Sequence, residues 1–211
     1  MEIRTTFVQG QATIHVSHRK GPPFGDAPDM DGALLLRPAG SAPIRSAEHE
    51  EPDMLTRVEI DAPGLSRRIF LAWSSPSWRR DMGMPVSFEV LLIEETFTLF
   101  LGAASVVAVV GLSDLRPISQ HRTGEFWGFE RKDGYVLELG ELDCFLYDLH
   151  GETLAHAPVD PPYETYETSE GIRFESLVFG TQWLRYPGAV PGVGSEGPGT
   201  CMKLGRGLRG S

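Results

Sequence analysis

A period-two alternation of apolar and polar residues recurs along much of the sequence, and this pattern most constrains the fold. The clearest example is residues 126–160, where Tyr135, Leu137 and Leu139 are separated by single residues and a turn follows at Gly140. Such alternation is typical of a strand with one buried face. No segment keeps a 3.6-residue period for more than a few turns, so we expect few or no long helices.

Turn residues divide the rest of the chain into short strands. Gly10 separates two alternating runs in residues 3–18, which indicates a hairpin, and 24 glycines and 16 prolines suit a chain with many turns. Residues 74–84 are the best place for a helical turn. The sequence therefore predicts an all-β fold, mainly an antiparallel meander of hairpins, arranged as a sandwich or a partly closed barrel.

The chain length suits a single domain. With 211 residues and 41% hydrophobic residues, the chain is large and apolar enough for one substantial core. We expect one β-rich domain over residues 1–186 and a long polar surface loop over residues 38–53. Residues 187–211 are rich in glycine and poor in apolar residues, so we expect a disordered tail there.

Two segments have similar sequences. Residues 99–115 (LFLGAASVVAVVGLSDL) resemble residues 137–154 (LELGELDCFLYDLHGETL) at an offset of 37 to 38, with Gly102 over Gly140. If the alignment is shifted by one residue, Leu112 aligns with Leu149. Two copies of a strand–turn–strand unit are typical of stacked hairpins or propeller-like blades, although short strands also give such similarity by chance.

Acidic residues are concentrated in one part of the chain. Ten acids lie between Glu138 and Glu175, where Arg173 is the only basic residue, so this window supplies −9 of the net charge of −10. One interpretation is an acidic face that attracts a basic partner, and the other is a solvated outer face of the meander. For the first interpretation, the candidate partner-binding residues are Glu138, Glu141, Asp143, Asp148, Asp160, Tyr163, Glu164 and Tyr166.

Several classes of function are disfavoured by composition and motifs. The net charge argues against a nucleic-acid-binding protein, and the sequence has no P-loop, no G-x-G-x-x-G and no G-x-S-x-G motif. The longest apolar run, residues 98–112, is shorter than a membrane helix needs. The first ten residues lack the pattern of a signal peptide, so we expect a cytoplasmic protein without contact to a membrane.

Three functional hypotheses follow. The first is a non-catalytic binding protein without a cofactor, such as an immunity- or inhibitor-type protein whose acidic face covers a basic protein. The second is a small metal-dependent β-barrel enzyme that uses His15, His18 and His49 as ligands. The third is a structural subunit of a larger assembly, with the apolar residues 99–112 near an interface.

Overall fold

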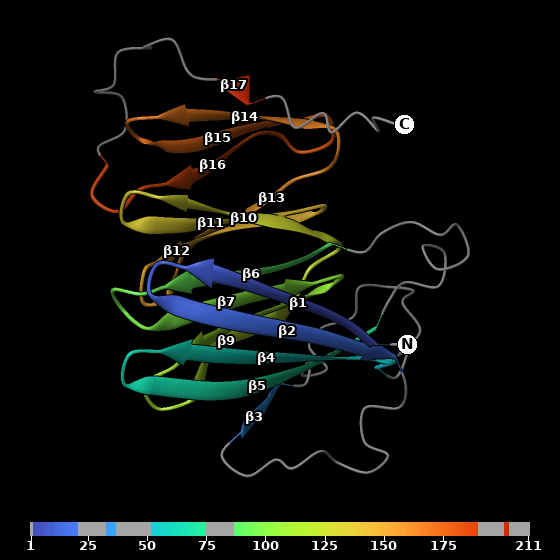
Figure 1. Ribbon diagram of the computed structural model, residues 1–211. Helices are drawn as coiled ribbons and strands as arrows, with labels where there is room; N and C mark the ends of the chain where they lie inside the picture. The colour runs from blue at the N-terminus through green and yellow to red at the C-terminus, as the bar shows by residue number, and fades with distance from the viewer. Residues whose placement is uncertain (1, 21–32, 37–51, 75–86, 190–200, 203–211) are drawn as a thin grey trace, which may run out of the picture.

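The structure, a computed structural model, describes residues 2–20, 33–36, 52–74, 87–189 and 201–202. These residues form four β-sheets and no helix, and the sheets are stacked as layers (Figure 1). The expected helical turn at residues 74–84 and the expected loop at residues 38–53 lie almost entirely outside the described residues.

The first sheet has the strand order β1-β2-β4-β5-β3. Its strands are β1 (Glu2–Gln9), β2 (Ala12–Lys20), β3 (Ala33–Leu36), β4 (Met54–Ala62) and β5 (Leu65–Trp73). The pairing of β3 with β5 is parallel, and the other pairings in this sheet are antiparallel.

The second and third sheets are consecutive four-stranded meanders. The second has β6 (Phe88–Ile93), β7 (Thr98–Ala103), β8 (Val106–Gly111) and β9 (Arg116–Arg122). The third has β10 (Phe126–Lys132), β11 (Tyr135–Gly140), β12 (Asp143–Asp148) and β13 (Thr153–Pro158). In both sheets the strands pair in the order of the chain, as the alternating pattern predicted.

The fourth sheet has the order β16-β15-β14-β17. Its strands are β14 (Tyr163–Thr168), β15 (Gly171–Ser176), β16 (Gly180–Arg185) and β17 (Cys201–Met202). The short strand β17 belongs to the glycine-rich C-terminal segment and pairs with Thr165 and Tyr166. The division of the chain into a domain and a disordered tail stays a prediction.

Apolar side chains hold each sheet to the next. One cluster joins the first and second sheets and includes Ile14, Ile60, Leu101 and Val110. A second cluster joins the second and third sheets and includes Phe100, Val107, Phe126 and Tyr147. A third joins the third and fourth sheets and includes Leu139, Leu146, Ile172 and Phe174. The second and third sheets are therefore covered on both faces.

The predicted fold class is confirmed. The described residues form an all-β, mainly antiparallel structure in which sheets pack face to face as a layered sandwich, and none of the sheets closes into a barrel. One expectation is corrected, because β7 and β8 lie in the middle of the stack and are almost completely buried. Residues 99–112 are consequently unavailable for the subunit interface that we considered.

The similarity between residues 99–115 and 137–154 has a structural counterpart. Ala104 N donates to Ser87 O at 3.0 Å, and Glu141 N donates to Glu125 O at 2.7 Å, at the same place in the second and third sheets. The strands β7 and β8 correspond to β11 and β12 at an offset of 37 residues. This offset places Leu112 over Leu149 as predicted, but it places Ala103, rather than Gly102, over Gly140.

No helix among the described residues is long and apolar enough to cross a membrane. The cytoplasmic location stays a prediction from the sequence.

Gly102 provides a test of the packing between the second and third sheets. A Cβ atom on this residue would overlap the side chain of Phe126, which is fully buried in the same cluster. We expect Gly102→Ala to lower the free energy of unfolding by about 1–3 kcal/mol, because the ring must shift within a close-packed core. Urea unfolding measures this change. The loss in free energy of unfolding of the double variant Gly102→Ala/Phe126→Leu should be smaller than the sum of the losses of the two single variants. A double-variant loss equal to that sum would contradict this packing.

Candidate functional site

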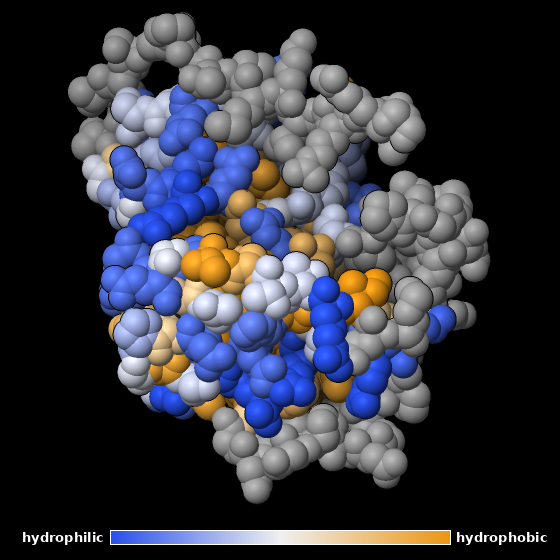
Figure 2. All heavy atoms as spheres, in the orientation of Figure 1, coloured by the Kyte–Doolittle hydropathy of each residue, from blue (hydrophilic) through white to orange (hydrophobic). Residues whose placement is uncertain are grey.

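The net charge of the described chain lies on one half of the stack. Residues 125–189, which form the third sheet and most of the fourth, contain 13 acids and four lysines or arginines. The remaining described segments contain eight acids and eight lysines or arginines. Figure 2, which is coloured by hydropathy and not by charge, shows hydrophilic side chains of these two sheets gathered over their left-hand part. The charge asymmetry of the sequence is therefore also an asymmetry in space.

Four of the predicted partner-binding residues lie at one end of the third and fourth sheets. Glu141 is in the β11–β12 turn, Asp143 begins β12, Asp160 is in the β13–β14 connection, and Glu164 is near the start of β14. Glu175, near the end of β15, is directly opposite Glu164. We call these five residues the acidic end.

Hydrogen bonds to backbone carbonyl oxygens fix the segments of the acidic end relative to one another. Val159 N donates to Leu142 O at 2.9 Å, which joins the β13–β14 connection to the β11–β12 turn. Ser176 Oγ donates to Asp160 O at 3.4 Å, which joins the same connection to the end of β15. The acids come from separate parts of the sequence, and the sheet registers bring them to one end of the stack.

Some carboxylates of the acidic end have partners. His156 Nε2 lies 2.6 Å from Asp143 Oδ1, and Arg173 Nε lies 3.2 Å from Glu175 Oε1. The Tyr166 hydroxyl donates to Glu164, and the guanidinium of Arg173 lies 4.8 Å from the centre of the Tyr166 ring. Tyr166 therefore lies on the outer face of the fourth sheet, next to the acidic end.

Asp148 lies at the other end of the third sheet. It ends β12, whereas Asp143 begins this six-residue strand. Its carboxylate accepts hydrogen bonds from His150 N and Glu152 N, both at 2.9 Å. Asp148 thus stabilises the β12–β13 turn, and the structure separates it from the other predicted acids.

Glu138 is buried, which corrects its assignment to an exposed acidic face. The residue has no exposed surface. His121 Nε2 lies 3.0 Å from Glu138 Oε1, and the Tyr147 hydroxyl donates to Glu138 Oε2 at 2.7 Å. Burial and the nearby carboxylate together raise the pKa of Tyr147 above its usual range. Because His121 belongs to β9, this network links the second sheet to the third.

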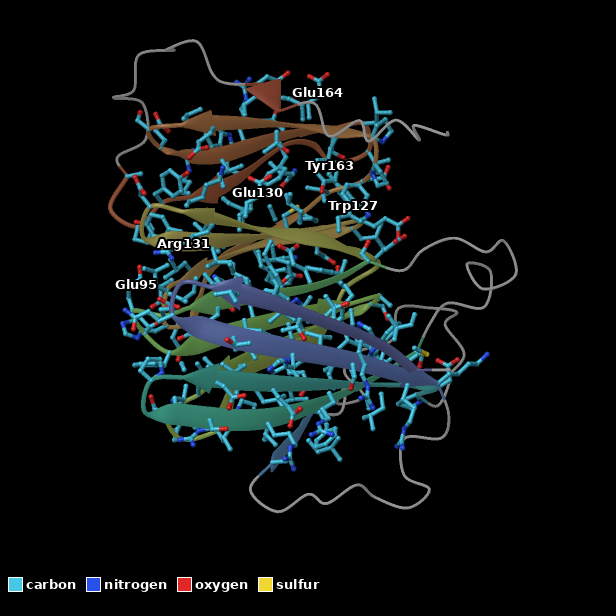
Figure 3. All side chains as sticks on the ribbon, in the orientation of Figure 1. Glu95, Trp127, Glu130, Arg131, Tyr163 and Glu164 are labelled. Carbon is cyan, nitrogen blue, oxygen red and sulfur yellow. The ribbon has the colours of Figure 1, made fainter. Side chains whose placement is uncertain are left out.

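Tyr163 is also buried and does not serve as an exposed aromatic anchor. Its ring stacks on Trp127 with the ring centres 5.2 Å apart, and its hydroxyl donates to Gly140 O at 2.9 Å. Figure 3 shows Tyr163 and Trp127 between the third and fourth sheets, and Glu164 on the outer side of the fourth. The buried Sγ of Cys144 lies 3.6 Å from the Tyr163 hydroxyl.

The histidines of the metal hypothesis are not brought together. His15 is exposed and its Nδ1 lies 2.9 Å from Thr6 Oγ1. His18 follows His15 by three residues along β2, so the two side chains point to opposite faces of the sheet. His18 Nδ1 lies 2.8 Å from Thr56 Oγ1, and burial lowers the pKa of His18. His49 lies outside the described residues. The part of the chain that the structure describes contains no group of three or more side chains suited to a metal ion.

A pocket that sequence reasoning missed lies at the opposite end of the stack. Its volume is about 490 Å³, and the β1–β2, β4–β5 and β6–β7 turns line it together with Arg131. Arg131 donates to Glu95 at 2.6 Å, and this hydrogen bond holds the pKa of Glu95 below its usual value (Figure 3). Glu94 accepts a hydrogen bond from Gln11 N at 2.8 Å. These charged groups hold the turns of three sheets together.

Sequence reasoning also missed three consecutive apolar residues at the acidic end. Leu177, Val178 and Phe179 connect β15 to β16 and are all exposed. The segment ESLVFG breaks the alternating pattern with three apolar residues in a row, which was the available signal.

Comparisons with known proteins give only a distant structural similarity. The sequence matches no family model and no curated protein sequence. Among solved structures, it is similar to the β-propeller domain of the Trilobed protease from Pyrococcus furiosus, with 8% identity and a TM-score of 0.44. The match covers 87% of this chain and 55% of that chain, so this protein spans about half the length of its structural match.

The buried network of Glu138 predicts a large difference between two glutamates of the same sheet. We expect Glu138→Ala to lower the free energy of unfolding by about 3–5 kcal/mol, because it leaves the buried Tyr147 hydroxyl and the His121 ring without their shared acceptor. The matched change Glu141→Ala, in a partly exposed turn, should alter stability by about 0.5 kcal/mol or less. Chemical unfolding of both variants tests this, and equal losses would contradict the assigned network.

Cys144 predicts how stability changes at alkaline pH. Burial raises the pKa of its thiol to about 12. The folded protein therefore keeps this proton at a pH where the unfolded chain loses it. The contribution of Cys144 to the free energy of unfolding is fully present below the pKa of the unfolded chain, and it is lost as the pH rises toward 12. We expect a loss of about 1.4 kcal/mol per pH unit from this group. Urea unfolding from pH 8 to 11 should show a shallower decline for Cys144→Ala than for the wild type.

Proposed function

We propose that this protein is a non-catalytic binding protein whose acidic end contacts a basic protein partner, in the manner of an immunity- or inhibitor-type protein. The observation that carries this proposal is the convergence of Glu141, Asp143, Asp160, Glu164 and Glu175 at one end of two sheets that hold nearly all the net charge. We also place the protein in the cytoplasm, on the grounds given by the sequence.

Electrostatics supports this surface as a docking site. The summed field of one-sided charge attracts an oppositely charged partner and raises its association rate. Glu164 and Glu175 are directly opposite each other on β14 and β15, and like charges in such positions destabilise a sheet. Arg173, whose Nε lies 3.2 Å from Glu175 Oε1, offsets part of this repulsion in the free protein, and a cationic side chain of a partner would offset more of it.

The scaffold also suits recognition by a preformed surface. The segments that carry Glu141 and Asp160 are joined by the backbone hydrogen bond between Val159 and Leu142. The same connection continues into Tyr163, which packs in the core between the third and fourth sheets. Such anchoring lowers the entropy that a binding surface loses when it meets its partner.

Charge reversal at the two ends of the stack tests the proposal. The probe is a fluorescent peptide of alternating lysine and serine, and its affinity is measured by anisotropy at low and at physiological ionic strength. We expect Glu141→Lys/Asp160→Lys to weaken binding at least about tenfold, which corresponds to about 1.4 kcal/mol.

The control has the same change in net charge at the opposite end. Asp133 and Glu152 are exposed residues in the β10–β11 and β12–β13 turns. Asp133→Lys/Glu152→Lys should weaken binding much less than the first variant. Equal weakening by the two variants, or unchanged affinity after reversal at the acidic end, would contradict the assignment of the site.

A further inference from the structure

The β15–β16 turn presents an unusual apolar surface to solvent. Leu177, Val178 and Phe179 are 78%, 68% and 46% exposed, respectively. We call these three residues the apolar tip. Single exposed apolar residues are common on protein surfaces, but contiguous ones indicate an interaction site.

The apolar tip is held in a defined conformation. Phe179 N donates to Ser176 Oγ at 3.3 Å, and Gln182 Nε2 donates to Phe179 O at 2.7 Å. Gly180 has a φ of 64°, a backbone conformation that favours glycine, and it pairs with Ser176 where β16 begins. The three side chains are therefore presented by a hydrogen-bonded turn at the end of a paired hairpin.

The apolar tip lies among the carboxylates of the acidic end. Ser176 precedes the tip and donates through Oγ to Asp160 O, and Glu175 precedes Ser176. Ser176 is also directly opposite Tyr163, which is followed by Glu164. Acids from β14, from β15 and from the β13–β14 connection thus flank the three apolar residues.

We propose that the apolar tip is the anchor of the binding surface and that it inserts into an apolar pocket rimmed by lysine or arginine residues on a protein partner. This inference rests on the proposed function, in which the acidic end attracts a basic partner. It adds the apolar contact that gives affinity. Interfaces of this kind combine a desolvated apolar or aromatic centre with a polar rim. Here Phe179 and Leu177 supply the centre, and the acidic end supplies the rim.

The surrounding charge distinguishes this partner from other occupants of the tip. An anionic membrane surface would be repelled by the five carboxylates of the acidic end. A second copy of this chain, docked through the same surface, would bring like charges together without compensation. An apolar pocket with a basic rim is complementary to both the apolar tip and the acidic end.

The test compares two peptides of equal positive charge. One is an amphipathic lysine–leucine peptide with its leucines on one side, and the other is the lysine–serine peptide. We expect Leu177→Ser/Val178→Ser/Phe179→Ser to weaken binding of the lysine–leucine peptide at least about tenfold. Binding of the lysine–serine peptide should change by less than about threefold, because its attraction depends on charge alone.

The control removes exposed apolar residues elsewhere. Ile3 and Val8 on β1 are 53% and 70% exposed, and Ile3→Ser/Val8→Ser should leave both affinities unchanged. Because these positions and the apolar tip are exposed, the free energy of unfolding of each variant, measured in urea, should equal that of the wild type within about 0.5 kcal/mol. This measurement excludes misfolding as a cause of lost binding.

The outcomes separate the two proposals. If the tip variant binds the lysine–leucine peptide as well as the wild type does, while binding of the lysine–serine peptide still depends on Glu141 and Asp160, the apolar tip is no anchor and the proposed function stands. If neither peptide binds the wild type, both proposals fail. Tip-dependent sedimentation with phosphatidylglycerol vesicles, or tip-dependent dimerisation in light scattering, would overturn the partner assigned here.

Discussion

Burial of both faces of the second and third sheets is the constraint on which the rest of the structure depends. In β7, Leu99 and Leu101 pack toward the first sheet, whereas Phe100 packs toward the third. A strand with two covered faces must be apolar almost throughout, as β7 and β8 are. The buried strands β7 and β8 therefore contain few polar side chains, and the turns and the outer face of the fourth sheet carry many of the exposed charges.

Where a charged side chain does lie between the central sheets, its partners define its role. The Glu138 carboxylate has hydrogen-bond partners on both oxygens, and they come from two different sheets. Such an arrangement lowers the cost of burying a charge, but it leaves the carboxylate no access to a partner protein. Glu141 and Asp160 remain accessible because they lie in connections between strands, where the backbone leaves the core.

The alternating pattern predicted the strands well and their environment poorly. Alternation assigned Leu137 and Leu139 to a buried face and Glu138 to an exposed one, yet all three are buried, because the third sheet packs on the fourth sheet with one face and on the second with the other. The mainly polar β16 went unnoticed, since its sequence GTQWLR alternates only weakly. The apolar tip went unnoticed because it follows no strand period.

The sequence alone determined the all-β class, the hairpin order of the central strands and the concentration of negative charge after residue 125, since these depend on local composition and on a period of two. Only the tertiary structure decided which acids share a surface. Strand register and sheet stacking placed Glu141 near Asp160 and separated Asp148 from both, and they buried Glu138 and Tyr163. Distances along the chain do not contain this information, because packing between sheets joins residues that the sequence separates.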